Sequence, residues 1–257
     1  GGTALLTLSH VTYKSAFLYD MEGITRVAHD RGALVLWDLS HSAGSVPISL
    51  RDSGADLAVG CTYKYLNSGP GAPAYLFVRR ELQECLRTPI WGWFGHKKPF
   101  DFNPCYHPAA SAARFGAGTP HILSLVPVER GVELLLEAGM EEIREKSLGQ
   151  TSFIVAMFEE ILKPLGFSLG SPAEGSKRGS HVSLRHEEAL RINQAMINPG
   201  AEVKPVIPDF RPPETIRLGV APLYTSYLDI YEALERMRII VENGEYRKFK
   251  RTIEGVT

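Results

Sequence analysis

The sequence predicts an α/β fold in which a mostly parallel sheet comes first and a smaller α+β domain follows. Three observations indicate this. Two short apolar runs, 33–37 and 57–61, stand between turn signals, which is typical of buried strands in a parallel sheet. A helical pattern precedes the first run, as in a strand–helix–strand crossover. In the last third of the chain, short apolar segments alternate with helical patterns.

The elements of the first part follow from local patterns. The stretch Ala4 to Leu8 predicts a buried strand, and Asp20 is a suitable cap for a helix that runs to about Asp30. The turn residues Gly69-Pro70-Gly71 predict a tight connection between two further strands. The expected strands that follow the helix are 33–38, 57–62 and 74–78.

The second part begins with a long irregular segment. Residues 89–120 are rich in proline, glycine and aromatic residues without a period, and loops of this length are usually functional. We therefore divide the chain into a partial large domain, 1–120, and a connecting helix with a small C-terminal domain, 121–257. Expected helices are 122–135, 140–165, 186–197 and 226–242, and expected strands lie around 180–185, 202–207 and 215–220.

Composition excludes several classes of function. The formal net charge of -1 and the pI near 6.8 provide no field that attracts nucleic acid or an anionic membrane. No stretch approaches the ~20 apolar residues that a membrane span needs. The cysteines Cys61, Cys85 and Cys105 lack metal-ligand spacing, so we expect no metal site and reduced thiols in a cytoplasmic protein.

The most informative residues stand where two predicted strands end. Asp38 ends the first apolar run and His41 follows it, while Tyr63 and Lys64 follow the second run. The carboxyl ends of neighbouring parallel strands meet at one edge of an open α/β sheet, so an acid and an amine would share a crevice. A pyridoxal phosphate enzyme needs this pair: a lysine for the Schiff base and an aspartate for the pyridinium nitrogen.

Five blocks of sequence resemble the fold type I pyridoxal phosphate enzymes, and within them the kynureninases. They lie in order over nearly the whole chain: D-L-S-H at 38–41, T-Y-K-Y-L-N at 62–67, G-W-F-G-H at 92–96, G-T-P at 118–120 and R-L-G-V-A-P-L-Y at 217–224.

The resemblance implies a role for each matching residue. Lys64 would form the Schiff base, and Tyr63 would contact the cofactor phosphate and deliver a proton. Asp38 would pair with the pyridinium nitrogen, and His41 would reach the cofactor's 3′-oxygen. The remaining roles are phosphate contact by Trp93 and Thr119, binding of the substrate's aryl ring by Phe94 and His96, and binding of its α-carboxylate by Arg217. Because Trp93 and Thr119 would serve the opposite subunit, a homodimer is also implied.

The resemblance also implies that this chain is a C-terminal portion. The sequence opens Gly1-Gly2-Thr3, and nothing in residues 1–37 matches the family's phosphate-gripping loop or its ring-stacking aromatic residue. We therefore expect the chain alone to have little or no activity.

The function implied is hydrolytic cleavage of L-kynurenine, or 3-hydroxykynurenine, to anthranilate or 3-hydroxyanthranilate and L-alanine, in tryptophan catabolism and NAD biosynthesis. A cysteine desulfurase or class V aminotransferase is the nearest alternative. Desulfurases usually have histidine directly before the Schiff-base lysine, where this chain has Tyr63, and Cys105 lacks the surroundings of their loop cysteine. A noncatalytic interaction module is the alternative from another class. The sequence neither chooses between the two kynurenines nor identifies the base that activates water.

Overall fold

The computed structural model describes residues 2–200 and 203–252. They form two compact units, each described here by itself. The first comprises residues 2–10, 20–43 and 48–134, and the second comprises residues 11–19, 44–47 and the described residues from 135 onward. The division into domains at residue 120 stays a prediction.

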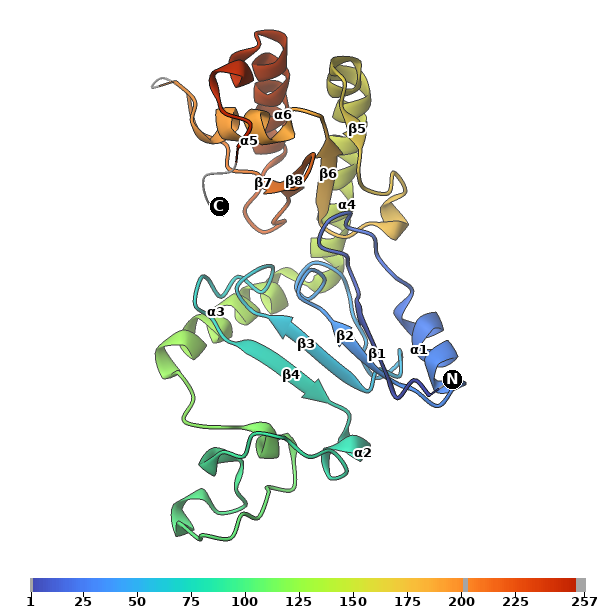
Figure 1. The fold of residues 1–257 in the computed structure, drawn as a ribbon, viewed down its shortest axis with the longest axis vertical. Coiled ribbons are helices and arrows are strands. Elements are labelled where there is room, and N and C mark those ends of the chain that lie inside the picture. Colours follow the sequence, from blue (N-terminus) through green and yellow to red (C-terminus); the bar gives the residue numbers. More distant parts are fainter. Residues whose placement is uncertain (1, 201–202, 253–257) are drawn as a thin grey trace. The chain divides into compact units, whose positions relative to one another are not determined.

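Four strands form the sheet of the first unit: β1 (Leu5–Ser9), β2 (Leu34–Asp38), β3 (Leu57–Cys61) and β4 (Ala74–Val78). Their order is β1-β2-β3-β4, and the pairs β1–β2 and β2–β3 are parallel (Figure 1). The pair β3–β4 is antiparallel, and the loop that joins the two strands contains no helix. Gly69 and Gly71 both have positive φ in this loop, as its tight path requires.

The first strand differs from the prediction. Its residues are half-buried or exposed rather than buried, and the Leu5 side chain is 46% exposed. The physical reason is its position: β1 lies at the edge of the sheet, and in the described part of the chain it pairs only with β2. An apolar sequence therefore indicated a strand correctly but not its burial.

The helix α1 (Met21–His29) confirms the predicted crossover between β1 and β2. The Asp20 side chain accepts a hydrogen bond from the Gly23 N–H at 3.0 Å, which caps the helix as expected. The buried face of the helix contains Met21, Thr25 and Ala28. Its Thr25 hydroxyl accepts a 3.0 Å hydrogen bond from the indole N–H of Trp37 in β2, which fixes the helix to the sheet.

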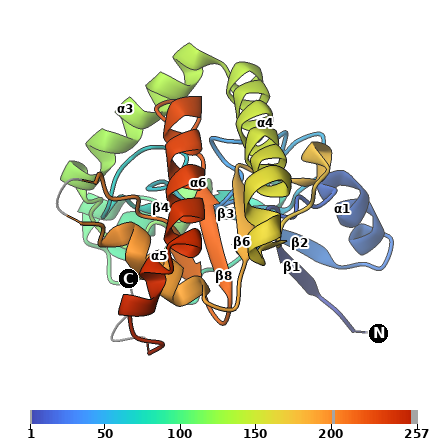
Figure 2. The same cartoon turned by 90° about the horizontal axis from the view of Figure 1, so that it is seen from above.

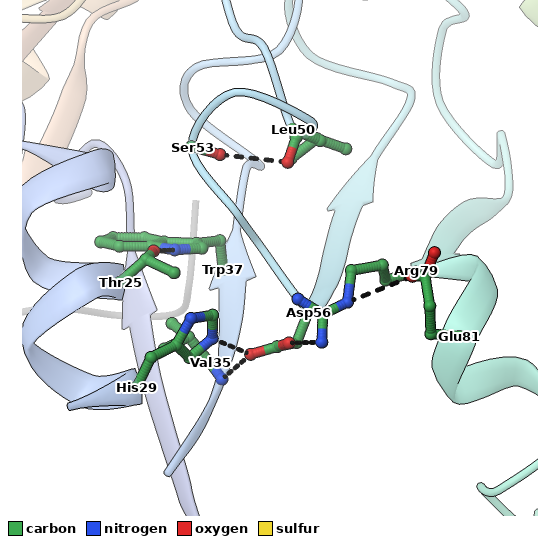
Figure 3. Close-up of polar contacts among 9 residues, drawn as sticks. All are labelled: Thr25, His29, Val35, Trp37, Leu50, Ser53, Asp56, Arg79 and Glu81. Atoms are coloured by element: carbon green, nitrogen blue, oxygen red, sulfur yellow. Dashed lines mark hydrogen bonds and ion pairs between the residues drawn. The ribbon is translucent and has the colours of Figure 1, made fainter. Parts of the chain in front are cut away.

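A buried carboxylate ties together the amino-terminal ends of β2 and β3 (Figure 3). The Asp56 side chain is fully buried directly before β3. It accepts a 2.8 Å hydrogen bond from the Val35 N–H and lies 2.7 Å from His29 Nε2. Arg79, which directly follows β4, places its Nη2 2.9 Å from Asp56 Oδ1. One side chain thus links α1, β2, β3 and the end of β4.

Beyond the sheet, the first unit continues through α2 (Arg80–Gln83) and an irregular segment with short 3-10 turns at 93–95, 99–101 and 112–115. This segment agrees with the predicted loop at 89–120. The helix α3 (Ile122–Ala138) follows it. Gly131 of α3 lies against the turn after Lys64, where a Cβ would clash with the Leu66 carbonyl oxygen.

The second unit contains the sheet β5-β6-β8-β7, in which all pairs are antiparallel. Apolar residues of α4, α5, α6, β6 and β8 form one buried core, so the helices cover one face of this sheet (Figure 2). The elements are α4 (Met140–Met157), a π-helical turn (Phe158–Leu162), β5 (Ser168–Leu169), β6 (His181–Arg185), α5 (Ala189–Ile197), β7 (Asp209–Arg211), β8 (Thr215–Gly219) and α6 (Tyr227–Glu242).

The strand predicted around 202–207 is wrong as far as the structure describes it. Residue 202 lies outside the described residues, and residues 203–207 form no strand; the third strand is β7 instead. Pro205 and Pro208 lack the N–H groups that a sheet ladder needs. The Val206 N–H bonds to the carbonyl of Met196 at 3.0 Å, so this segment is held by the end of α5.

Candidate active site

Asp38, His41 and Lys64 gather at the carboxyl edge of the parallel strands. Asp38 is the last residue of β2 and lies opposite Val59 of β3. Lys64 follows the end of β3 by three residues, in a bend rather than at the strand end itself. The predicted meeting of an acid and an amine at this edge thus agrees with the strand register.

Two donors orient the Asp38 carboxylate. The Ser40 N–H donates to Oδ1 at 2.9 Å, and the Ser9 hydroxyl donates to Oδ2 at 3.4 Å. Sequence reasoning missed Ser9. It ends β1 and lies opposite Asp38 in the sheet, so the register of the two strands was the signal that could have found it.

The Lys64 amine lies beside an imidazole. Its Nζ is 3.2 Å from His41 Nε2 and 5.4 Å from the centre of the Tyr63 ring. The Lys64 side chain is half-buried, whereas Tyr63 is half-exposed. The charged amine can donate to a neutral imidazole, and the neutral amine can accept from it, so a proton can be held between these two nitrogens.

The turn that follows Lys64 is held at several points. The Asn67 N–H bonds to the Lys64 carbonyl at 2.9 Å, and the Ser68 N–H bonds to the Thr62 carbonyl at 3.1 Å. Asn67 has a φ of 57°, a left-handed conformation that asparagine tolerates better than most residues. Gly131 of α3 packs against this turn, so a helix from far along the chain also determines where Lys64 lies.

Tyr75 is a further group near Asp38 that sequence reasoning missed. The pKa of its phenol is raised from 10.0 to about 12, mainly by burial and in smaller part by the charges of Cys61 and Asp38. A Cβ on Gly60 would clash with the Tyr75 hydroxyl, so the glycine makes room for this ring. The tyrosine therefore stays protonated beside the carboxylate throughout the neutral range.

We expect Tyr75 to ionise near pH 12 rather than near pH 10. Its folded-state pKa is raised, so its contribution to stability is present below pH 10 and is lost as the pH rises through about 12. Ultraviolet difference absorbance of phenolate measures this, because Tyr75→Phe should remove the transition near pH 12. Loss of a transition near pH 10 in Tyr75→Phe would contradict the expectation.

The aromatic residues of the loop form a cluster of their own. Trp93 is 43% exposed, and its ring makes edge contacts with Phe94 and Phe100. His96 accepts a hydrogen bond from the Lys98 N–H at Nδ1 and lies 3.2 Å from the Cys105 carbonyl through Nε2. These contacts of Trp93, Phe94 and His96 are within the loop, and Thr119 is exposed.

The same loop lines one side of an open pocket of about 200 Å³. Trp91 and Tyr106 line it and stack at 4.9 Å with nearly parallel rings. Arg114 also lines it and anchors the loop through the carbonyls of Gln83 and Ala109, at 2.6 and 2.9 Å. Sequence reasoning gave Trp91 and Tyr106 no role.

Arg217 lies in the second unit, on β8. Its side chain is only 14% exposed and pairs with Asp209. The predicted carboxylate-binding residue therefore already has an anionic partner, which the sequence did not indicate.

The described residues contain neither a metal-binding cluster nor a membrane-spanning helix. Within 2–200 and 203–252, no group of three histidine, cysteine, aspartate or glutamate side chains could hold a metal ion. No helix in the same residues is sufficiently long and apolar to cross a membrane.

Comparison with known proteins identifies relatives of the chain. Residues 143–237 match the family model of the kynureninase C-terminal domain. The kynureninase of Pseudomonas fluorescens is 41% identical over 240 residues, which are 93% of this chain and 56% of that protein. The chain is similar to kynureninases over more than nine tenths of its own length. A kynureninase of Burkholderia mallei (strain SAVP1) is 40% identical over 95% of the chain and 58% of that protein.

The chain therefore spans less than two thirds of the length of the curated proteins that it matches. Solved structures show the fold. The apo cysteine desulfurase of Thermococcus onnurineus NA1 matches with a TM-score of 0.74 and 19% identity, over 94% of this chain and 61% of that one. A lysine-to-alanine mutant of C-DES, with glycine covalently linked to its PLP cofactor, matches with a TM-score of 0.75 and 16% identity, over 92% and 60%. The predicted fold class, part of a fold type I pyridoxal phosphate-dependent transferase fold, is confirmed.

Proposed function

We propose that this chain contains the cofactor-binding lysine of a pyridoxal phosphate-dependent kynureninase, a hydrolase that cleaves the Cβ–Cγ bond of L-kynurenine to give anthranilate and L-alanine. One observation supports this most directly: Lys64 Nζ lies 3.2 Å from His41 Nε2, at the sheet edge where β2 ends in Asp38. The sequence similarity to kynureninases over more than nine tenths of the chain favours this activity over desulfuration or transamination.

The donor set fits pyridoxal phosphate. The Lys64 amine would bind the cofactor's aldehyde carbon, Asp38 would pair with its ring nitrogen, and His41 would contact its 3′-oxygen. Ser9 and Ser40 already hold the Asp38 carboxylate, so it is oriented before the cofactor binds. When bound, the cofactor supplies an electron sink for the bonds that break at the substrate's α-carbon and β-carbon.

The chain's own groups would then move protons and orient the substrate. Once released from the cofactor, the Lys64 amine would take the α-proton, and His41 is near enough to exchange a proton with it. The Tyr63 hydroxyl would donate a hydrogen bond to the cofactor phosphate or a proton to the β-carbon of the substrate. The Arg217 guanidinium would bind the α-carboxylate of the amino acid.

A homodimer completes the proposal, with Trp93 and Thr119 contacting the cofactor phosphate of the other subunit and with Phe94 and His96 near the aryl ring of the substrate. Its support is the exposed apolar surface on the loop and the start of α3. This surface comprises Trp91, Trp93, Phe100, Phe102, Ile122, Leu123 and Val126. We place the protein in the cytoplasm because Cys61, Cys85 and Cys105 are free thiols.

The test compares this chain with a version extended upstream by the N-terminal part that its relatives possess. Both are titrated with pyridoxal phosphate by absorption spectroscopy, and kcat/KM for L-kynurenine is then measured. We expect a cofactor spectrum and turnover in the extended version, and little turnover in the chain alone, because positioning supplies much of an enzyme's rate. A cofactor-loaded extended version that desulfurates L-cysteine but leaves L-kynurenine intact would refute the proposal.

A further inference from the structure

Asp209 and Arg217 face each other across two strands of the second sheet. They are register partners in β7 and β8, and Asp209 Oδ2 pairs with Arg217 Nη2. Residues 216 and 218 lie opposite Leu184 and Val182 of the buried core. Side chains alternate along a strand, so Arg217 projects from the sheet face opposite the helices.

A second anchor holds the same guanidinium. Arg217 Nη1 donates a 2.6 Å hydrogen bond to the carbonyl of Tyr13, in the segment 11–19 of the same unit. That segment is itself fixed, because the Ser183 hydroxyl donates to the Lys14 carbonyl and Lys14 Nζ donates to the Pro212 carbonyl at 2.9 Å. Both terminal nitrogens of Arg217 thus have partners that are fixed to the sheet.

This arrangement affects charge as well as orientation. Arg211 Nη2 lies 2.7 Å from the same oxygen of Asp209, so two guanidinium groups share one carboxylate and the cluster has one net positive charge. Ordering a free arginine side chain costs conformational entropy. An arginine side chain that is ordered before the ligand binds loses less conformational entropy on binding, so its binding free energy is more favourable.

We propose that Asp209 is a positioning residue for substrate binding: its carboxylate holds the Arg217 guanidinium in the orientation that receives the α-carboxylate of the amino-acid substrate. This inference rests on the proposed function in two respects, that the ligand is an α-amino acid and that Arg217 binds its α-carboxylate. Asp209 acts through Arg217 and does not itself contact the reacting atoms.

The test uses the holoenzyme of the extended protein and three variants. Asp209→Asn keeps the shape of the side chain but removes its charge, Asp209→Glu restores the charge, and Arg211→Gln removes the other guanidinium as a matched control. For each protein, kcat and KM for L-kynurenine are measured, together with the dissociation constant of L-alanine from the absorption spectrum of the bound cofactor. The decarboxylated amine of kynurenine serves as a probe that lacks the carboxylate.

We expect Asp209→Asn to raise KM and the L-alanine dissociation constant by about tenfold, with kcat and the cofactor spectrum nearly unchanged. Asp209→Glu should recover part of the loss, Arg211→Gln should have a smaller effect, and affinity for the carboxylate-free amine should not change. In a double-mutant cycle, Asp209→Asn should add little to Arg217→Lys.

Two results would overturn the inference. Tighter L-alanine binding in Asp209→Asn would mean that Asp209 competes with the substrate's carboxylate, and equal weakening of the carboxylate-free amine would mean a general structural role. A parent that binds L-alanine but does not turn over kynurenine would refute the proposed function and leave the inference standing, provided that the variants respond as expected.

Discussion

Replacing Lys64 should remove both the covalent attachment of the cofactor and the activity. We expect Lys64→Arg, in the extended protein, to lower kcat by about 10³-fold or more, because general acid–base catalysis alone supplies about 10²–10⁴-fold. Arginine keeps the positive charge near His41 but does not form the covalent bond, so the loss would reflect chemistry rather than charge. Borohydride reduction followed by peptide mapping should place the pyridoxyl group on the peptide that contains Lys64.

Lys97 and Lys98 provide matched controls, because both are exposed lysines of the first unit. Lys97→Arg and Lys98→Arg should leave the cofactor adduct and kcat unchanged. A pyridoxyl group mapped to either of them, or to Lys14, would show that Lys64 is not the attachment site.

The second large effect concerns stability. Asp56→Ala should lower the free energy of unfolding by about 3 kcal/mol, because it leaves the Val35 N–H without its acceptor and Arg79 without its buried partner. The side chains of Arg79 and His29 are each about one third exposed, so water reaches them. The expected decrease in the free energy of unfolding therefore lies at the lower end of the range for broken buried ion pairs. Urea unfolding of the cofactor-free protein measures the difference.

The same network offers a control at its solvent-exposed end. Glu81 lies 3.4 Å from Arg79 but its side chain is mostly exposed (Figure 3), so Glu81→Ala should change the free energy of unfolding by less than about 1 kcal/mol. Asp56→Asn should fall between the two, because an amide oxygen still accepts from the Val35 N–H. Equal stability of the parent and Asp56→Ala would refute the role assigned to this carboxylate.

Local sequence signals predicted the parts of the fold that depend on local chemistry. Side-chain preferences that act within a few residues explain the Asp20 cap, the apolar face of α1 and the strands β2 and β3. The placement of Asp38 and Lys64 at the same edge of the sheet was predictable because parallel strands place their carboxyl ends at one edge.

The rest depends on neighbours that a single sequence does not reveal. Burial of β1 depends on what lies beside it. The strand β7 was misplaced because Val203, Val206 and Ile207 suit a strand, although Pro205 and Pro208 lack the N–H groups that a sheet ladder needs. Ser9 reaches Asp38 only through the register of β1 with β2, and Asp209 reaches Arg217 only through the register of β7 with β8. Pairing across strands is long-range information, so these partners required the structure.

The contact between Gly131 and the turn after Lys64 has a consequence for how this protein tolerates mutation. Any side chain at position 131 would push on the Leu66 carbonyl, and the displacement would reach the lysine without altering a group that touches a ligand. In a library of random variants screened for activity, substitutions of Gly131 should therefore be lost as often as substitutions of the active-site residues. Compensating changes should appear in the 66–67 turn, so these two segments are expected to vary together among homologous sequences.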